Sequence, residues 1–280
     1  MQKYVIVSKN VFQSTSTNDI NDPLLATEIC TELIIMRLRL IELLNTGIIN
    51  KNDVIVTRIE RKCLYENIFP NIIDYQDFLK LNIQENVIDI VSQIYTLCKT
   101  IKYKPFYNRF ELDKEQILNI KLSTDLKFDV SQPFICLLIR KRGAWPEKNL
   151  PDNYWYGLIN YLNTLNIRIA VFGKETERFC DNINSFHINS FQDWCAILSY
   201  STCKCVISTA TGGVYPIFFT GHKKSKLIII DNTLLIRENG HDASFYNNCI
   251  NFTNTELMVL ETVPDYPALY NTIVIRFDEK

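Results

Sequence analysis

The stretch "DNYWYGLINYLNTLNIRIAVFG", residues 152–173, joins a helical pattern directly to a buried strand. Its apolar residues recur at positions i, i+3, i+4 and i+7: Trp155, Leu158, Ile159 and Leu162. This spacing predicts an amphipathic helix with one face on a core. The run "IRIAVFG" (167–173) is apolar without alternation, as in a strand that is covered on both faces. A helix that leads straight into such a strand is typical of a parallel α/β sheet.

The same alternation continues on both sides of this stretch. Apolar runs predict strands at "FICLLI" (134–139), "KCVIS" (204–208) and "KLIIID" (226–231). Between them, "FQDWCAILSY" (191–200) predicts a helix. Strands that alternate with helices at this spacing indicate a doubly wound parallel sheet.

The N-terminal half shows a similar but weaker pattern. It has predicted strands at "YVIVSK" (4–9) and "DVIVT" (53–57), and predicted helices over 24–46, 63–69 and 85–99. Gly47 is the expected C-cap of the first helix. The polar segment "KLSTDLKFDVSQP" (121–133) separates the halves as a linker. The predicted fold class is α/β, with two Rossmann-like domains, residues 1–125 and 126–280, facing a cleft.

The composition excludes several classes of protein. The 280 residues have a formal net charge of −1 and are 47% hydrophobic, which supports a packed core and argues against a nucleic-acid partner. The nine cysteines are scattered through apolar runs, as buried reduced thiols are, and their spacing matches no zinc site, so we expect no metal. There is neither the apolar region of a signal peptide nor a span of about 18 apolar residues, so we expect a cytoplasmic protein without a transmembrane segment.

The loops after the predicted strands of the C-terminal half are the candidate site, because ligands of open α/β sheets bind beyond the carboxyl ends of the strands. These loops offer cations, hydroxyls and glycines: Arg140, Arg142, Lys148, Gly173, Glu175, Thr209, Thr211, Gly212 and Gly213. Cations, and backbone amides that glycine leaves accessible, suit a phosphate-bearing ligand. The alternative is a tight turn at the two glycines and a solvated basic loop, with no ligand.

Two segments carry a resemblance to a known family. They are "GAWPEKNLPDNYWYGLINYLNTLNIRIAVFGKETE" (143–177) and "DWCAILSYSTCKCVISTATGGVYPIFFTG" (193–221). The landmarks are a strand, a Trp-Pro-x-Lys-like stretch, a helix, a strand ending in a Gly-x-x-x-Glu stretch, and a helix and strand closing in an Asp-Thr-Gly-like loop. In this order the chain resembles the C-terminal half of heptosyltransferases and related glycosyltransferases of the GT-B fold.

The resemblance implies that the C-terminal half binds a nucleoside-diphosphate sugar. Lys148 and the loop Thr211–Gly213 match positions that contact the donor phosphates, and Gly173 and Glu175 match positions near the nucleotide. The stretch "IRKRG" also resembles the arginine motif of GT-B fucosyltransferases. By that resemblance, Arg140 or Arg142 would neutralise the leaving diphosphate.

The resemblance also implies a catalytic base in the N-terminal half, where Asp19 and Asp22 are the candidates, although both equally fit helix caps before Pro23. Glu238 stands where GT-B proteins often bind ribose through a carboxylate. The chain departs from the family at Ala210, where an Asp is usual, and in lacking glycine in the loop after its first strand.

The expected function is transfer of a sugar from a nucleoside-diphosphate donor to the hydroxyl of a glycan or glycoconjugate acceptor. Inverting stereochemistry follows from the resemblance alone. The sequence offers no Asp-x-Asp triplet for a divalent ion, so we expect metal-independent transfer without a cofactor. Two alternatives stay open: a sugar-nucleotide epimerase or hydrolase of the same fold, and a catalytically degenerate binding module. The sequence leaves the donor sugar, base, acceptor and oligomeric state open.

Overall fold

The computed structural model describes residues 2–9, 36–93, 122–141, 146–173, 175–181, 184–209, 211–214, 216–219, 225–230 and 255–274. Its contacts divide the chain into two compact units, Met1–Leu122 and Ser123–Lys280. The division falls inside the segment predicted as a linker. Phe128 of that segment is nevertheless buried, because its ring packs edge-on against Phe134 with centroids 4.9 Å apart.

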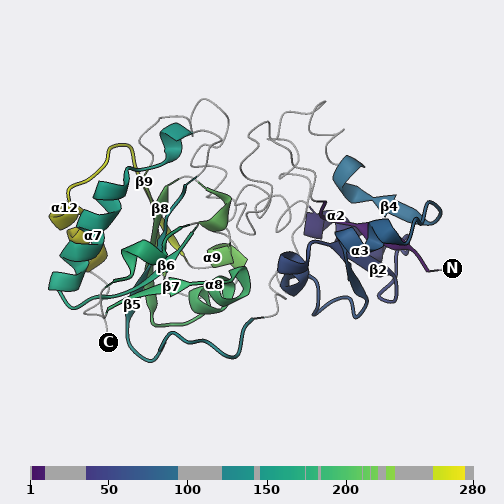
Figure 1. The fold of residues 1–280 in the computed structure, drawn as a ribbon, viewed down its shortest axis with the longest axis horizontal. Coiled ribbons are helices and arrows are strands. Elements are labelled where there is room, and N and C mark those ends of the chain that lie inside the picture. Colours follow the sequence, from purple (N-terminus) through teal and green to yellow (C-terminus); the bar gives the residue numbers. More distant parts are fainter. Residues whose placement is uncertain are drawn as a thin grey trace. The chain divides into compact units, whose positions relative to one another are not determined.

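The second unit contains a sheet of six parallel strands (Figure 1). The strands are β5 (Phe134–Leu138), β6 (Arg168–Phe172), β7 (Ser185–Ile188), β8 (Cys203–Thr209), β9 (Lys226–Ile230) and β10 (Glu256–Leu260). Their order is β10-β9-β8-β5-β6-β7. The chain therefore starts in the middle, winds outward to β7, and returns beside β5 to wind outward the other way. The carboxyl ends of β5 and β8 flank this switch point, where doubly wound sheets bind ligands.

Helices cover both faces of this sheet, with α7 (Asp152–Thr164) and α12 (Tyr266–Val274) on one face and α8 (Phe191–Leu198) and α9 (Pro216–Phe219) on the other (Figure 1). The predicted apolar face of α7 is buried, since Trp155, Leu158 and Leu162 pack in one cluster with residues of β5 and β6. On the other face, the indole ring of Trp194 in α8 stacks on Phe172. The Ser190 hydroxyl caps α8 by accepting a hydrogen bond from Asp193 N at 3.0 Å.

The first unit contains four parallel strands in the order β3-β2-β1-β4. They are β1 (Tyr4–Ile6), β2 (Val54–Thr57), β3 (Ile72–Asp74) and β4 (Val87–Asp89), with helices α2 (Arg37–Asn45) and α3 (Tyr75–Lys80) and the 3-10 helix η2 (Ile59–Leu64). Gly47 has a φ of +71° just after α2, which confirms it as the residue that ends this helix. Residues 24–35 of the predicted helix lie outside the described residues.

The prediction of a helix over 85–99 was wrong at its start. Val87–Asp89 form β4, which pairs in parallel with β1 from Tyr4 to Ile6. The β-branched residues Val87 and Ile88 favour a strand. At these residues, pairing with β1 outweighs the helical pattern of the sequence over 85–99. The helix expected over 63–69 is also absent, because the 3-10 helix η2 ends at Leu64 and turns follow it.

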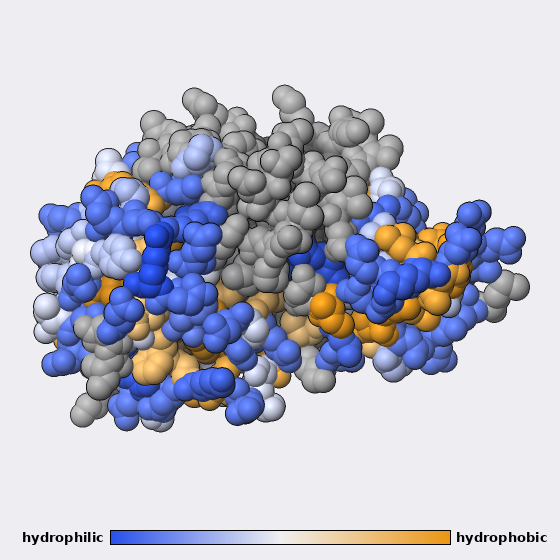
Figure 2. Space-filling view, viewed as in Figure 1, coloured by the Kyte–Doolittle hydropathy of each residue, from blue (hydrophilic) through white to orange (hydrophobic). Residues whose placement is uncertain are grey.

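The predicted fold class is confirmed: the chain is α/β, with one parallel sheet in each unit. Among the described residues, no helix is long and apolar enough to cross a membrane. On the face drawn in Figure 2, hydrophilic side chains cover much of the surface, and an apolar area lies over the first unit. Large exposed hydrophobic side chains of that unit are Ile48, Ile59, Leu79 and Leu81.

Candidate functional site

The carboxyl ends of β5 and β8 are tied together at the switch point of the six-stranded sheet. The Ser208 hydroxyl donates a hydrogen bond to the Leu138 carbonyl oxygen at 2.9 Å. Beside it, Thr209 ends β8 and is 1% exposed, and its Oγ1 has no hydrogen-bond partner among the described residues. Burying a hydroxyl without a partner costs about 1–3 kcal/mol. Thr209 therefore keeps an unused donor and acceptor at the point where a ligand of this fold class would lie.

The loop after β8 contains the 3-10 helix η5 (Gly212–Val214), and α8 holds it in place. The Trp194 Nε1 atom donates a hydrogen bond of 2.9 Å to the Gly213 carbonyl oxygen. A Cβ atom at Gly213 would lie 2.8 Å from Cδ2 of Leu138. Gly213 is thus required by close packing of the loop on β5. A side chain at Gly213 would therefore point at Leu138, as in the alternative expectation of a tight turn at the two glycines.

Two of the predicted cations are buried beside this edge. Arg140, two residues beyond β5, is 5% exposed, and its guanidinium donates to the Asn149 side-chain oxygen. Lys148 ends the 3-10 helix η3 (Pro146–Lys148) and is 7% exposed. Arg140 thereby contacts the residue that follows Lys148 and fixes the segment that carries it. Burial weakens the hydration of these cations, which strengthens their interaction with any anion that comes within reach.

The loop after β6 is shaped by a close contact between two backbone segments, the one that follows β6 and the one that follows β5. Gly173 has a φ of +146°, and a Cβ atom there would lie 2.3 Å from the Ile139 carbonyl oxygen. The Thr176 hydroxyl closes the turn by donating to the Gly173 oxygen at 2.9 Å. Glu175 adopts a φ of +55° and is exposed. Gly173 is therefore a packing requirement, and Glu175 presents its carboxylate to solvent.

An ion-pair network that sequence reasoning missed joins these loops to α7. Asp152, the first residue of α7, accepts hydrogen bonds from Lys141 at 2.8 Å and from Arg178. Both cations also lie over the Phe179 ring, at 5.4 Å for Lys141 Nζ and 5.2 Å for the Arg178 guanidinium carbon. Asp152 thus links the segment after β5 to the 3-10 helix η4 (Glu177–Phe179) after β6. The sequence holds one signal for it, since Lys141 and Arg178 each follow one of these strands and Asp152 opens the helix between them.

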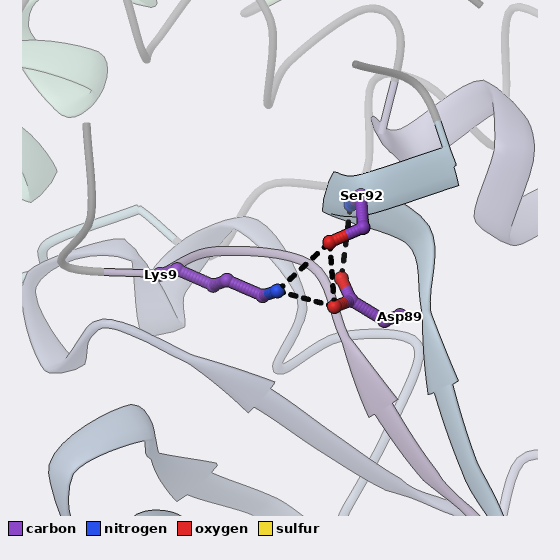
Figure 3. A network of polar contacts seen from close by, with 3 residues as sticks. All are labelled: Lys9, Asp89 and Ser92. Atoms are coloured by element: carbon purple, nitrogen blue, oxygen red, sulfur yellow. Dashed lines mark hydrogen bonds and ion pairs between the residues drawn. The ribbon is translucent and has the colours of Figure 1, made fainter. Parts of the chain in front are cut away.

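The first unit has a polar network at the carboxyl ends of β1 and β4 (Figure 3). Lys9 pairs with the Asp89 carboxylate and donates to the Ser92 hydroxyl at 3.0 Å. Asp89 also accepts from the Ser92 amide at 3.0 Å and the Ser92 hydroxyl at 2.8 Å. Burial raises the pKa of Asp89, but the Lys9 and Ser92 contacts together outweigh it and lower the pKa below its ordinary value. Lys9 and Ser92 therefore favour the charged form of the Asp89 carboxylate.

Comparison with solved structures places the fold. The structure of E. coli heptosyltransferase WaaC with ADP matches with a TM-score of 0.50 and 11% identity, over 99% of this chain and 98% of that chain. The E. coli ADP-heptose lps heptosyltransferase II matches with a TM-score of 0.51 and 8% identity, over 99% of this chain and 100% of that chain. This chain has a GT-B-like fold. No model of a protein family and no curated protein sequence matches the chain.

Within this GT-B-like fold, the structure brings together part of the predicted site. Arg140, Lys148, Gly173, Thr209 and the loop Thr211–Gly213 all follow strands at one edge of the six-stranded sheet. Four predicted residues lie outside the described residues: Asp19, Asp22, Arg142 and Glu238. Within the described part of the chain, no three His, Cys, Asp or Glu side chains are grouped so that they could hold a metal ion.

Proposed function

We propose that this protein is a glycosyltransferase that moves a sugar from a nucleoside-diphosphate donor to an acceptor hydroxyl. The observation that carries the proposal is the set of buried polar groups at the β5–β8 switch point. The unpartnered hydroxyl of Thr209 lies at this edge, and so do two cations, Arg140 and Lys148, that are almost fully buried. An anion with several oxygens suits such groups. The GT-B-like fold supports sugar transfer as the chemistry.

In the proposed reaction, the acceptor oxygen forms a bond to the anomeric carbon of the donor sugar while the bond to the diphosphate oxygen breaks. Negative charge grows on the leaving diphosphate. Arg140, Arg142, Lys148 and the amides of Thr211–Gly213 would stabilise that charge, since donors already in place act strongly at developing charge. No metal is needed for this role. Glu238 would bind the ribose, and Glu175 and Gly173 would lie near the nucleotide.

A carboxylate of the N-terminal half, Asp19 or Asp22, would take the proton of the acceptor hydroxyl as general base. Attack from the face opposite the leaving diphosphate gives the inverting outcome that the resemblance to heptosyltransferases implies. The acceptor would be a glycan or glycoconjugate. These assignments to Asp19 and Asp22 predict that replacing the true base by Asn abolishes transfer and leaves donor binding intact.

A thermal-shift screen against nucleotides and nucleotide sugars tests the proposal. A ligand that binds only the folded state stabilises it by about 2.7 kcal/mol at a hundred times its dissociation constant. We expect nucleoside diphosphates and their sugars to stabilise the protein, and nucleosides to do so much less. If no nucleoside diphosphate stabilises the protein at millimolar concentration, the proposal is wrong.

A product assay then separates the candidate functions. A transferase consumes the nucleotide sugar and releases the diphosphate only, or mainly, when an acceptor is present. Equal turnover with and without acceptor would instead identify the epimerase or hydrolase alternative. Tight binding without turnover across an acceptor panel would favour the degenerate binding module, for which the Ala210 departure is the supporting observation.

A further inference from the structure

Trp194 connects the end of β6 to the loop after β8. Its side chain is fully buried, with 0% exposure. The indole ring stacks on Phe172, the last residue of β6, with ring centroids 5.0 Å apart and planes tilted by only 13°. From this fixed position, Nε1 donates its hydrogen bond of 2.9 Å to the Gly213 carbonyl oxygen.

This hydrogen bond sets the orientation of one peptide group in the loop. The Gly213–Val214 peptide is planar and trans, so its carbonyl and its N–H point in opposite directions. Because the Gly213 carbonyl points at α8, the Val214 N–H points away from α8. That N–H donates to the Thr211 oxygen at 3.4 Å, and Val214 is 0% exposed, so this peptide is enclosed and helps to hold the shape of the loop. Gly213 allows this arrangement because it has no side chain, so the loop can pack directly against Leu138.

Packing alone does not account for the hydrogen bond. Trp155 of α7 is also 0% exposed, and its Nε1 finds no hydrogen-bond acceptor among the described residues. Among the described residues, the same unit thus contains one buried indole whose N–H has no acceptor and one whose N–H is bonded to a loop. We propose that Trp194 is a positioning residue, which holds the segment Thr211–Gly213 in the conformation that binds the donor diphosphate. The inference rests on the proposed function, because it assigns that role to the same loop.

The test compares Trp194→Phe with Trp155→Phe in the full-length protein. Both changes shrink a fully buried aromatic ring, but only Trp194→Phe removes a hydrogen bond to the loop. Calorimetric titrations use ADP, UDP, GDP and CDP together with the matching nucleosides. We expect Trp194→Phe to weaken diphosphate binding about tenfold or more, because the competent loop conformation becomes a minor one. Nucleoside affinity should stay unchanged in both variants.

A second replacement keeps the test valid if Trp194→Phe does not fold. Placing 3-benzothienylalanine at position 194 keeps the size of the ring and exchanges the indole N–H for sulfur. Hydrogen exchange of the loop amides should accelerate with this replacement and with Trp194→Phe, but not with Trp155→Phe.

The outcomes separate this inference from the function it rests on. Wild-type protein that binds none of the four diphosphates overturns the proposed function and the role of Trp194 with it. Wild-type protein that binds one of them, with equal affinity in the Trp194 and Trp155 variants, overturns the positioning role alone. Equal losses for diphosphate and nucleoside would also overturn it, since a distorted domain would weaken both.

Discussion

Gly213→Ala should destabilise the second unit through a single contact, and removing that contact should restore it. The added Cβ would lie 2.8 Å from Cδ2 and 3.4 Å from Cδ1 of Leu138. Overpacking of this kind costs about 1–3 kcal/mol. Leu138→Ala alone should cost about 2–5 kcal/mol, because it leaves a cavity at the end of β5. In the double variant the new methyl group enters that cavity, so we expect a favourable coupling of about 1–3 kcal/mol.

Urea denaturation followed by tryptophan fluorescence measures the coupling. All three tryptophans, Trp145, Trp155 and Trp194, lie in the unit Ser123–Lys280, so the signal reports the unfolding of that unit. Gly157→Ala is the matched control. Its Cβ would meet the Tyr266 hydroxyl and not Leu138, so its effect should add to that of Leu138→Ala within about 0.5 kcal/mol.

Additive effects of Gly213→Ala and Leu138→Ala would refute the packing reason for this glycine. The loop would then have to lie further from β5 than described, and its two glycines would need another explanation. A favourable coupling between Gly157→Ala and Leu138→Ala would show that Leu138→Ala makes the unit more tolerant of added methyl groups in general. The coupling with Gly213→Ala would then not report the contact between Gly213 and Leu138.

Lys148→Ala should weaken binding of a nucleoside diphosphate by about 1.5–3 kcal/mol, roughly ten- to a hundredfold, and leave nucleoside binding unchanged in calorimetric titration. Equal effects on both ligands would place the phosphates elsewhere. Sugar transfer should continue in excess EDTA. If EDTA abolished transfer and magnesium or manganese restored it, the proposal that Arg140, Arg142 and Lys148 stabilise the leaving diphosphate without a metal would be contradicted. Because the pKa of Asp89 is lower in the folded protein, its stabilisation is full above the unfolded pKa of about 4 and is lost as the pH falls through the folded pKa. The protection of β1 and β4 amides against hydrogen exchange, relative to their intrinsic exchange rates at each pH, should therefore fall in acid, and less so in Asp89→Asn. Thr209→Val should leave stability unchanged or raise it while weakening diphosphate binding, and a loss of stability with unchanged binding would show a structural hydroxyl.

The central elements of the second unit were predictable because their signals are local. β5 is apolar throughout, β6 and β9 are apolar after one charged residue, and β8 contains the apolar run Cys205–Ile207, while α7 has an apolar face of regular spacing. The edge strands β7 and β10 were missed, because "SFHI" and "ELMVL" are only partly buried and mixed in polarity. Such segments become strands because they pair with a neighbouring strand, β6 for β7 and β9 for β10, as β4 does with β1.

The candidate site was predictable in position but not in detail. Parallel strands place their carboxyl ends at one edge, so residues after strands gather there whatever the loops do. The contacts of Gly213 with Leu138 and Trp194 depend on which face of the sheet the loop packs against, and no short-range pattern encodes that. The sequence therefore left the glycine pair open between accessible amides for a phosphate and a tight turn, and at Gly213 the structure shows close packing on the Leu138 side chain.

Glycine is consequently weak evidence for a phosphate site in this chain, and Thr209 is stronger. Gly173 and Gly213 both have packing reasons that hold without any ligand. Valine has nearly the shape of threonine and favours strands equally. The hydroxyl of Thr209 is buried without a partner among the described residues, so it adds nothing to the stability of the fold that a valine would not supply. Thr57 repeats the pattern, since it is the last residue of β2 and its hydroxyl is also buried and has no partner among the described residues. Both threonines end parallel strands, at the edge of each sheet where this fold class binds ligands. At that edge, a buried hydroxyl that is costly by itself can form a hydrogen bond with a ligand.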